Sequence, residues 1–103
     1  MTRRRSIAFA RVAGAALANN EAIVSRWLPG GRREGAEWVC RNPRRADAHP
    51  GSFKVNLRNG KWSDFATGDC GGDLIALAAY LFDLRQDEAA IKVGDMLGVN
   101  PYD

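Results

Sequence analysis

The sequence is poor in the residues that build metal centres, disulfide frameworks and membrane spans. It contains two cysteines and one histidine. These counts exclude a four-cysteine zinc site, a site that needs two histidines and a disulfide framework. No apolar run approaches the roughly 18 residues of a membrane span. The 103 residues leave room for one domain, which excludes a large multidomain enzyme. We expect a single domain over residues 1–103 that works in the cytoplasm and contacts no membrane.

Charge is distributed unevenly along the chain. Residues 1–62 hold thirteen Lys and Arg against four acidic residues, a formal charge of +9. Residues 63–103 hold two against eight, a formal charge of −6. Twelve of the fifteen basic residues are arginines, which suit bidentate phosphate contacts and stacking on bases. The basic half predicts a polyanionic partner, and a merely solubilising surface is the alternative.

Residues 1–28 have two interpretations. The basic start at Arg3–Arg5 and the alanine-rich apolar stretch after it are typical of an export signal. Arg11 interrupts that stretch, however, and the apolar residues recur at helical spacing. We therefore expect a helical N-terminal part with a break at Asn19 or Asn20 and a stop at Pro29-Gly30-Gly31.

The centre of the chain predicts a β-hairpin. Ser52–Arg58 alternates strictly, with Phe53, Val55 and Leu57 on one face. Asn59-Gly60 is the strongest short hairpin signal, and Lys61–Ala66 would be the returning strand. Gly35–Cys40 predicts a further short strand.

Two helices are expected after the hairpin. Asp73 is a plausible N-cap for an apolar stripe over Leu74–Phe82. A last helix would start near Gln86 or Asp87 and end at Gly98. The predicted fold is α+β: an N-terminal helix, a small antiparallel sheet with a central hairpin, and two C-terminal helices on one face of the sheet.

The polar face of the hairpin is the first candidate site. It presents Lys54, Asn56 and Arg58, with Lys61 and Trp62 after the turn. Basic side chains beside an aromatic ring suit a single strand of nucleic acid, because charge follows the phosphates and bases stack on rings. The alternative is a solvated sheet face with Trp62 capping the core.

Other chemistry finds little support in the sequence. The glycine-rich turn over 68–73 could cradle an anion, but its aspartates would repel a phosphate. The segment therefore predicts a tight strand-to-helix turn.

Cys40, His49 and Cys70 are the candidate zinc ligands. They are far apart in the sequence and form no close C-x-x-C or C-x-x-H pair. We expect no zinc and no other cofactor. No catalytic constellation stands out, so we expect a binding module and no enzyme.

Three short segments point to a known family by their order and spacing: Cys40–Pro43, Gly51–Asn56 and Gly71–Ile75. They resemble the zinc-binding domain of bacterial and phage DNA primases. The sequence motifs of that family are, in chain order, approximately C-P-x-H, P-S-F-x-V and C-x-G-C-G-x-G-G-D-x-I. A hairpin lies between the second and the third motif, and a helix follows the third. The resemblance runs from Trp38 to Leu81 and implies a zinc-ribbon-like module over residues 36–103.

The departure from that family concerns the metal ligands. Besides Cys40, the family's ligand positions fall at Pro43, Phe65 and Gly68, and Cys70 is out of register. The resemblance therefore implies a zinc-free version of the fold, as in primase-like and helicase-like proteins of phages, plasmids and integrated elements. We expect buried aromatic rings to replace the stabilisation that a metal gives to folding. The candidates are Trp38, Phe53, Trp62 and Phe65.

By resemblance, the chain is expected to be a single-stranded DNA-binding accessory module of a mobile-element replication protein. RNA is an open alternative as the ligand, and any catalytic primase domain would lie outside the chain. The cations would contact phosphates, and Trp62 would stack on a base. The residues expected to bind nucleic acid are Arg41, Arg44, Arg45, Lys54, Arg58, Lys61 and Trp62.

A protein-interaction module is the second hypothesis. The metal-free fold would then dock on a primase, helicase or polymerase partner. Basic residues that share one exposed face with Trp62 would favour nucleic acid. Scattered basic residues and an exposed apolar patch would favour a protein partner.

Overall fold

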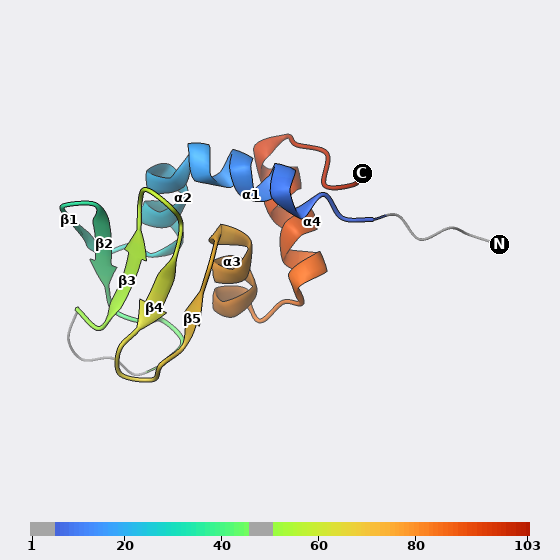
Figure 1. Cartoon of the computed structure of the whole chain (residues 1–103). Helices are drawn as coiled ribbons and strands as arrows, with labels where there is room; N and C mark the ends of the chain where they lie inside the picture. The colour runs from blue at the N-terminus through green and yellow to red at the C-terminus, as the bar shows by residue number, and fades with distance from the viewer. Residues whose placement is uncertain (1–5, 46–50) are drawn as a thin grey trace.

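The computed structural model describes residues 6–45 and 51–103. Within these ranges the chain forms helices at both ends and short strands between them (Figure 1). This is the predicted α+β layout. The elements in chain order are α1 (Phe9–Ala18), α2 (Asn20–Trp27), β1 (Arg32–Glu34), β2 (Glu37–Cys40), β3 (Phe53–Asn56), β4 (Trp62–Asp64), β5 (Cys70–Gly71), α3 (Leu74–Phe82) and α4 (Gln86–Leu97).

The strands form one antiparallel sheet in the order β1-β2-β3-β4-β5. Val55 pairs with Trp62 across β3 and β4, and Lys54 pairs with Ser63. Because side chains alternate along a strand, Val55 and Trp62 share the inner face, where both are buried. Lys54 and Ser63 share the opposite, outer face.

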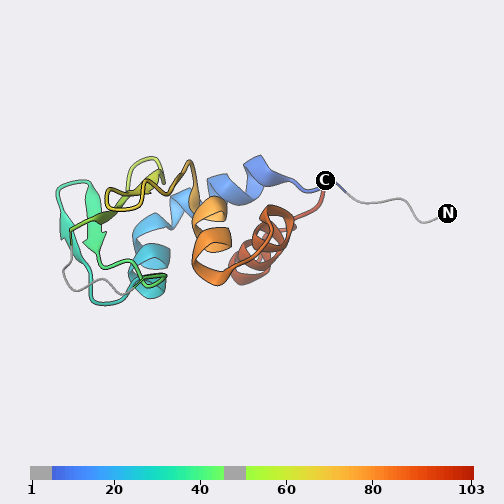
Figure 2. The ribbon, with the colours of Figure 1, turned by 90° about the horizontal axis from the view of Figure 1, so that it is seen from below.

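The helices gather on one side of the sheet and beyond it. Both views place the sheet at one end of the molecule, α3 in the middle and α4 at the other end (Figures 1 and 2). Helix α2 contacts β2, and α1 packs against α3 and α4. A continuous core joins these elements, with Val12 from α1, Phe53 from the sheet and Leu77 from α3 all fully buried. No helix of residues 6–45 and 51–103 lies over the outer face of the sheet (Figure 2).

The N-terminal segment is helical, as expected. It breaks at Asn19, where α1 ends and α2 begins. The described end of the chain before α1 is tied to the C-terminal residues: Ile7 pairs with Tyr102, and an Arg11 Nη1 donates to the Tyr102 carbonyl at 2.9 Å. Arg3–Arg5 lie outside the described residues. Among the helices of the described ranges, none has the length and apolarity to cross a bilayer.

The caps of the two C-terminal helices agree with prediction. The Asp73 carboxylate accepts a hydrogen bond from the Ala76 N–H at 2.8 Å and so caps α3. Gly98 ends α4 with a φ of 70°, a conformation in which glycine carries no steric penalty.

The sheet differs from prediction in three places. The hairpin forms, but residues 57–61 connect its strands, so the turn is wider than two residues. Strand β1 was not predicted because its residues are charged and exposed. Strand β5 has only two residues and lies within the segment predicted as a turn. Pairing with β2 and β4, rather than local apolar pattern, creates these two strands.

One of the four aromatic residues predicted for the core lies outside it. Phe53 and Trp62 are buried, and Trp38 packs against the core from its edge. Phe65 is 74% exposed. It follows Asp64 in the alternation of β4, and Asp64 takes the inward position.

Candidate nucleic-acid interface

The outer face of the sheet forms a shallow groove with a basic rim. Alternation in β3 turns Lys54 and Asn56 outward, and Ser63 of β4 lies opposite Lys54. The groove has a volume of about 380 Å³, and Lys54 and Lys61 are its cationic residues, beside the single acid Glu37. The amides of Asn56 and Asn59 and the hydroxyl of Ser63 supply uncharged hydrogen-bonding groups. A groove of this composition suits a polyanion with hydrogen-bonding edges.

Phe65 is the exposed aromatic residue next to this groove. It lies two residues after Ser63, so alternation places it on the same face of the sheet as Ser63. Its backbone N–H donates to the Ser52 carbonyl at 2.9 Å. The Lys54 ammonium lies 5.7 Å from the centre of the Phe65 ring. A cation and an exposed ring within this distance can bind a phosphate and the base attached to it.

The connection between β3 and β4 carries the basic side chains of Arg58 and Lys61 on a backbone that side-chain hydrogen bonds hold in place. The Asn56 carboxamide oxygen accepts from the backbone N–H groups of Arg58 and Asn59, at 2.8 and 3.2 Å. The Asn59 side chain accepts from the Lys61 N–H at 2.9 Å. These bonds fix the connection without using the Arg58 or Lys61 side chains, which are exposed. Neither side chain forms an ion pair with any residue that the structure describes.

Arg41 and Arg44, both predicted to bind nucleic acid, occupy different surroundings. Arg41 is exposed directly after β2. The Arg44 guanidinium lies 5.5 Å from the centre of the Tyr80 ring and 3.9 Å from the Asp83 carboxylate. Arg44 is therefore at the helix side of the molecule, away from the outer face of the sheet.

Arg45 does not serve as a surface cation. Its Nε donates to the Asp64 carboxylate at 2.8 Å, and an Nη donates to the same carboxylate at 3.2 Å. A further bond of 2.6 Å joins Arg45 to the Ser52 hydroxyl. The Asp64 side chain is completely buried. These contacts do not favour the phosphate-binding role predicted for Arg45, because its guanidinium already binds a carboxylate.

We use the term polar clasp for Asn42, Arg45, Asp64 and Tyr80. The Asn42 amide donates to Asp64 and to the Tyr80 hydroxyl, each at 2.8 Å. The backbone N–H of Ala66 adds a bond of 2.8 Å to Asp64. The clasp thus joins the segment after β2, the end of β4 and helix α3.

Electrostatics within the clasp favour the ionised carboxylate. The hydrogen bonds from Arg45 hold the pKa of Asp64 well below the usual range of an aspartate, against the opposing effect of burial. Burial raises the pKa of the Tyr80 phenol, and its hydroxyl donates to Asp69 at 2.7 Å. The clasp is therefore charged and fully engaged at neutral pH.

Trp62 is also placed differently from prediction. Its side chain is 5% exposed, and its ring lies 5.9 Å from the Phe53 ring and 4.8 Å from the Tyr80 ring. A Cβ at position 71 would lie 2.5 Å from the indole, so Gly71 is what lets β5 cover this ring. Trp62 is therefore a core residue, and its burial does not favour the stacking on a base that the sequence predicted for it.

The two features that the sequence analysis missed have different origins. Exposure of Phe65 follows from alternation once Trp62 is placed on the inner face, so the sequence contained that signal. The Arg45–Asp64 pair joins residues 19 positions apart, and no local pattern marks it.

Comparisons with known proteins bear on the fold. No family model matches the sequence, and no curated protein does. Among solved structures, the crystal structure of the Aquifex aeolicus primase, comprising its zinc-binding and RNA polymerase domains, superposes with a TM-score of 0.75. The fold is similar to part of a bacterial primase. The match has 21% identity and covers 92% of this chain, which spans 22% of the primase chain. The primase-like fold predicted from the sequence is thereby confirmed.

The residues that the structure describes offer no donor set that fits a zinc ion. No group of three or more His, Cys, Asp or Glu suited to a metal occurs in residues 6–45 and 51–103. Cys40 pairs with Phe53 on the inner face, whereas Cys70 pairs with Ser63 on the outer face. His49 lies outside the described residues. Two cysteines on opposite faces of a sheet cannot share one tetrahedral ion.

Proposed function

We propose that the chain is a single-stranded nucleic-acid-binding module that uses the outer face of its sheet and the hairpin tip. The observation that carries the proposal is the Lys54–Phe65 contact on the outer face. Lys61 lines the groove that Lys54 also lines, and Arg58 is exposed on the connection between β3 and β4. Lys54, Arg58 and Lys61 form no ion pair with any described residue, so binding them to phosphates breaks no ion pair of the described chain. Phe65 replaces Trp62 as the ring on which a base would stack.

We propose single-stranded DNA as the ligand, with RNA of the same sequence as the comparison. The module would act in the cytoplasm as a non-catalytic accessory part of a replication protein of a mobile element. The similar fold in the Aquifex aeolicus primase accompanies an RNA polymerase domain in a longer chain. That arrangement supports a role beside a larger replication enzyme such as a primase, helicase or polymerase.

We further propose that the module folds and binds without zinc or another cofactor. The polar clasp supports this view, because it links the segment after β2 to the end of β4 by hydrogen bonds and an ion pair. In the resemblance drawn above, the positions of the metal ligands lie next to these two parts of the chain. Dialysis against a chelator should leave the denaturation midpoint unchanged, and a lowered midpoint would contradict a zinc-free fold.

The test is a fluorescence anisotropy titration of a labelled single-stranded oligonucleotide at two salt concentrations. Weak binding with little sequence preference is expected. A triple variant, Lys54→Ala with Arg58→Ala and Lys61→Ala, should weaken binding by about tenfold at low salt. It should also reduce the slope of log K against log salt by about 2, because three phosphate contacts are lost.

The matched control removes the same charge from the helices. The variant Arg26→Ala with Arg85→Ala and Lys92→Ala has the same net charge as the first triple variant, and all three positions are exposed. It should bind as the unmodified protein does. Equal weakening in both variants would show that net charge alone drives binding, and it would overturn the assignment of the outer face.

Phe65 is tested separately. Phe65→Ala should weaken binding by about tenfold, in line with the loss of one stacked base. Phe9→Ala is its control, since Phe9 is 43% exposed on α1. If the two variants bind equally well, Phe65 does not contact a base.

A further inference from the structure

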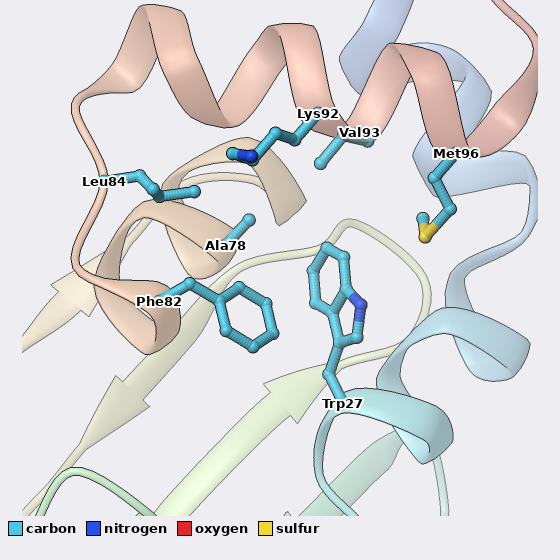
Figure 3. Close-up of a pocket in the computed structure, with 7 residues that line it drawn as sticks. All are labelled: Trp27, Ala78, Phe82, Leu84, Lys92, Val93 and Met96. Carbon is cyan, nitrogen blue, oxygen red and sulfur yellow. The ribbon is translucent and has the colours of Figure 1, made fainter.

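A second surface feature lies among the helices, away from the proposed nucleic-acid interface. An open apolar pocket of about 330 Å³ lies between the end of α2, the end of α3 and the middle of α4. Figure 3 shows Trp27, Phe82 and Met96 around its mouth, with Ala78 and Val93 deeper between the helices. No residue of the sheet lines it.

The exposure of its lining residues is unusual for this molecule. Phe82 is 52% exposed and Met96 is 44% exposed, and both are among the few large apolar side chains of the described residues that face solvent. The Trp27 ring meets Phe82 edge to face, with ring centres 5.6 Å apart. This contact fixes the positions of the two aromatic side chains that line the pocket in the unbound protein. Aromatic residues and methionine are the residue types enriched at the centres of protein interfaces.

The charge of the pocket indicates what kind of partner would fill it. Lys92 is its one charged lining residue. The Lys92 ammonium forms no ion pair within the part of the chain that the structure describes. A second copy of the chain, docked through the same pocket around a two-fold axis, would bring the two Lys92 side chains, and thus like charges, together. A partner with a carboxylate at the rim complements the pocket instead.

We propose that this pocket docks an amphipathic helix of a partner protein, with apolar side chains in the pocket and an acidic residue against Lys92. The size of the pocket suits one or two apolar side chains, which a helix presents at i and i+3 or i+4. Docking at this site goes beyond the proposed nucleic-acid binding. It uses none of the residues of the outer sheet face, so both ligands can be bound together.

The test uses two synthetic amphipathic helical peptides with the same leucine stripe. One peptide carries glutamates beside the stripe, and the other carries lysines at the same positions. Binding is followed by NMR through the Trp27 indole and the Met96 methyl signals of the full chain. The glutamate peptide should shift both signals and bind about fivefold more tightly than the lysine peptide. Lys92→Glu should reverse that preference.

Two variants and one solution measurement keep the proposal falsifiable. Met96→Asp and Phe82→Asp should each lower the affinity for the glutamate peptide by about tenfold. Both side chains are exposed enough for the fold to persist in the variants. A circular dichroism spectrum checks the fold. Three results would overturn the proposal: unchanged Trp27 and Met96 signals at millimolar peptide, equal affinity for the two peptides, and sedimentation showing self-association through this pocket.

Discussion

The sheet end and the helical end of this molecule are held together by different physical means. In the sheet end, short strands of two to four residues contribute Phe53, Val55 and Trp62 to the core, and a buried ion pair also links the segment after β2 to the end of β4. In the helical end, α1, α3 and α4 meet through apolar side chains such as Val12, Leu77 and Val93. The small sheet thus adds specific polar contacts to its packed inner face, whereas the helices depend on packed apolar area.

The two ends also differ in what they offer to partners. The sheet presents Lys54, Lys61 and Phe65 on an uncovered face, which suits nucleic acid. The helices present Phe82 and Met96 around an apolar pocket with Lys92, which suits an acidic amphipathic helix. The basic residues are therefore divided between two surfaces. The sequence offered a nucleic-acid partner and a protein partner as alternatives, and the two surfaces can serve one partner each.

The largest effect is expected from breaking the polar clasp. Asp64→Ala leaves the Arg45 guanidinium without its carboxylate and removes the acceptor of the Ala66 N–H. The free energy of unfolding should fall by about 3–5 kcal/mol, the cost of removing one partner of a buried pair. Urea denaturation followed by circular dichroism measures it. Asp95→Ala, at an exposed position of α4, is the control, and equal losses in the two variants would contradict the role of the clasp.

A comparable break at the helical end is Leu77→Ala. Leu77 is fully buried in α3, and its truncation should cost about 2–5 kcal/mol through lost contacts and the cavity left behind. The same urea experiment applies. In contrast to Asp64→Ala, this loss should be independent of pH between about 3 and 7. If the loss of stability in Leu77→Ala changed with pH as strongly as that in Asp64→Ala, it would contradict the proposed difference between the two ends.

The smallest effect expected is the change in stability at acidic pH. The folded-state pKa of Asp64 lies below its unfolded value, so its contribution to stability is present above the ordinary aspartate range near pH 4 and is lost as the pH falls towards the folded pKa. The loss can reach about 1.4 kcal/mol per pH unit. We predict that the unmodified chain and Asp64→Asn, compared by denaturation from pH 7 to pH 2, converge in stability at low pH. A constant difference across this range would contradict the ionised clasp.

Much of the fold follows from local sequence signals. The break at Asn19, the cap at Asp73 and the stop at Gly98 each depend on one residue and its neighbours, and each was predicted. Strand β1 escaped prediction because Arg32, Arg33 and Glu34 have no apolar alternation. It exists because β2 offers it a pairing edge.

The site was predicted less well, for two reasons. A two-residue turn at Asn59-Gly60 would pair Leu57 with Trp62, whereas the structure pairs Val55 with Trp62. Both registers put Trp62 on the inner face and Phe65 on the outer face, so strict use of alternation would have placed both rings. Arg45, by contrast, could not be assigned, because only the folded chain brings it to Asp64.

The central claim is that nucleic acid binds to the outer face of the sheet. Its most direct test is a map of backbone amide shifts on addition of a single-stranded oligonucleotide to the isotope-labelled protein at low salt. We predict that the shifts concentrate at Lys54, Ser63 and Phe65 and along the 57–61 connection, with α4 unaffected. Shifts that concentrate on α3 and α4, or no shifts at tens of micromolar protein with excess oligonucleotide, would contradict the claim.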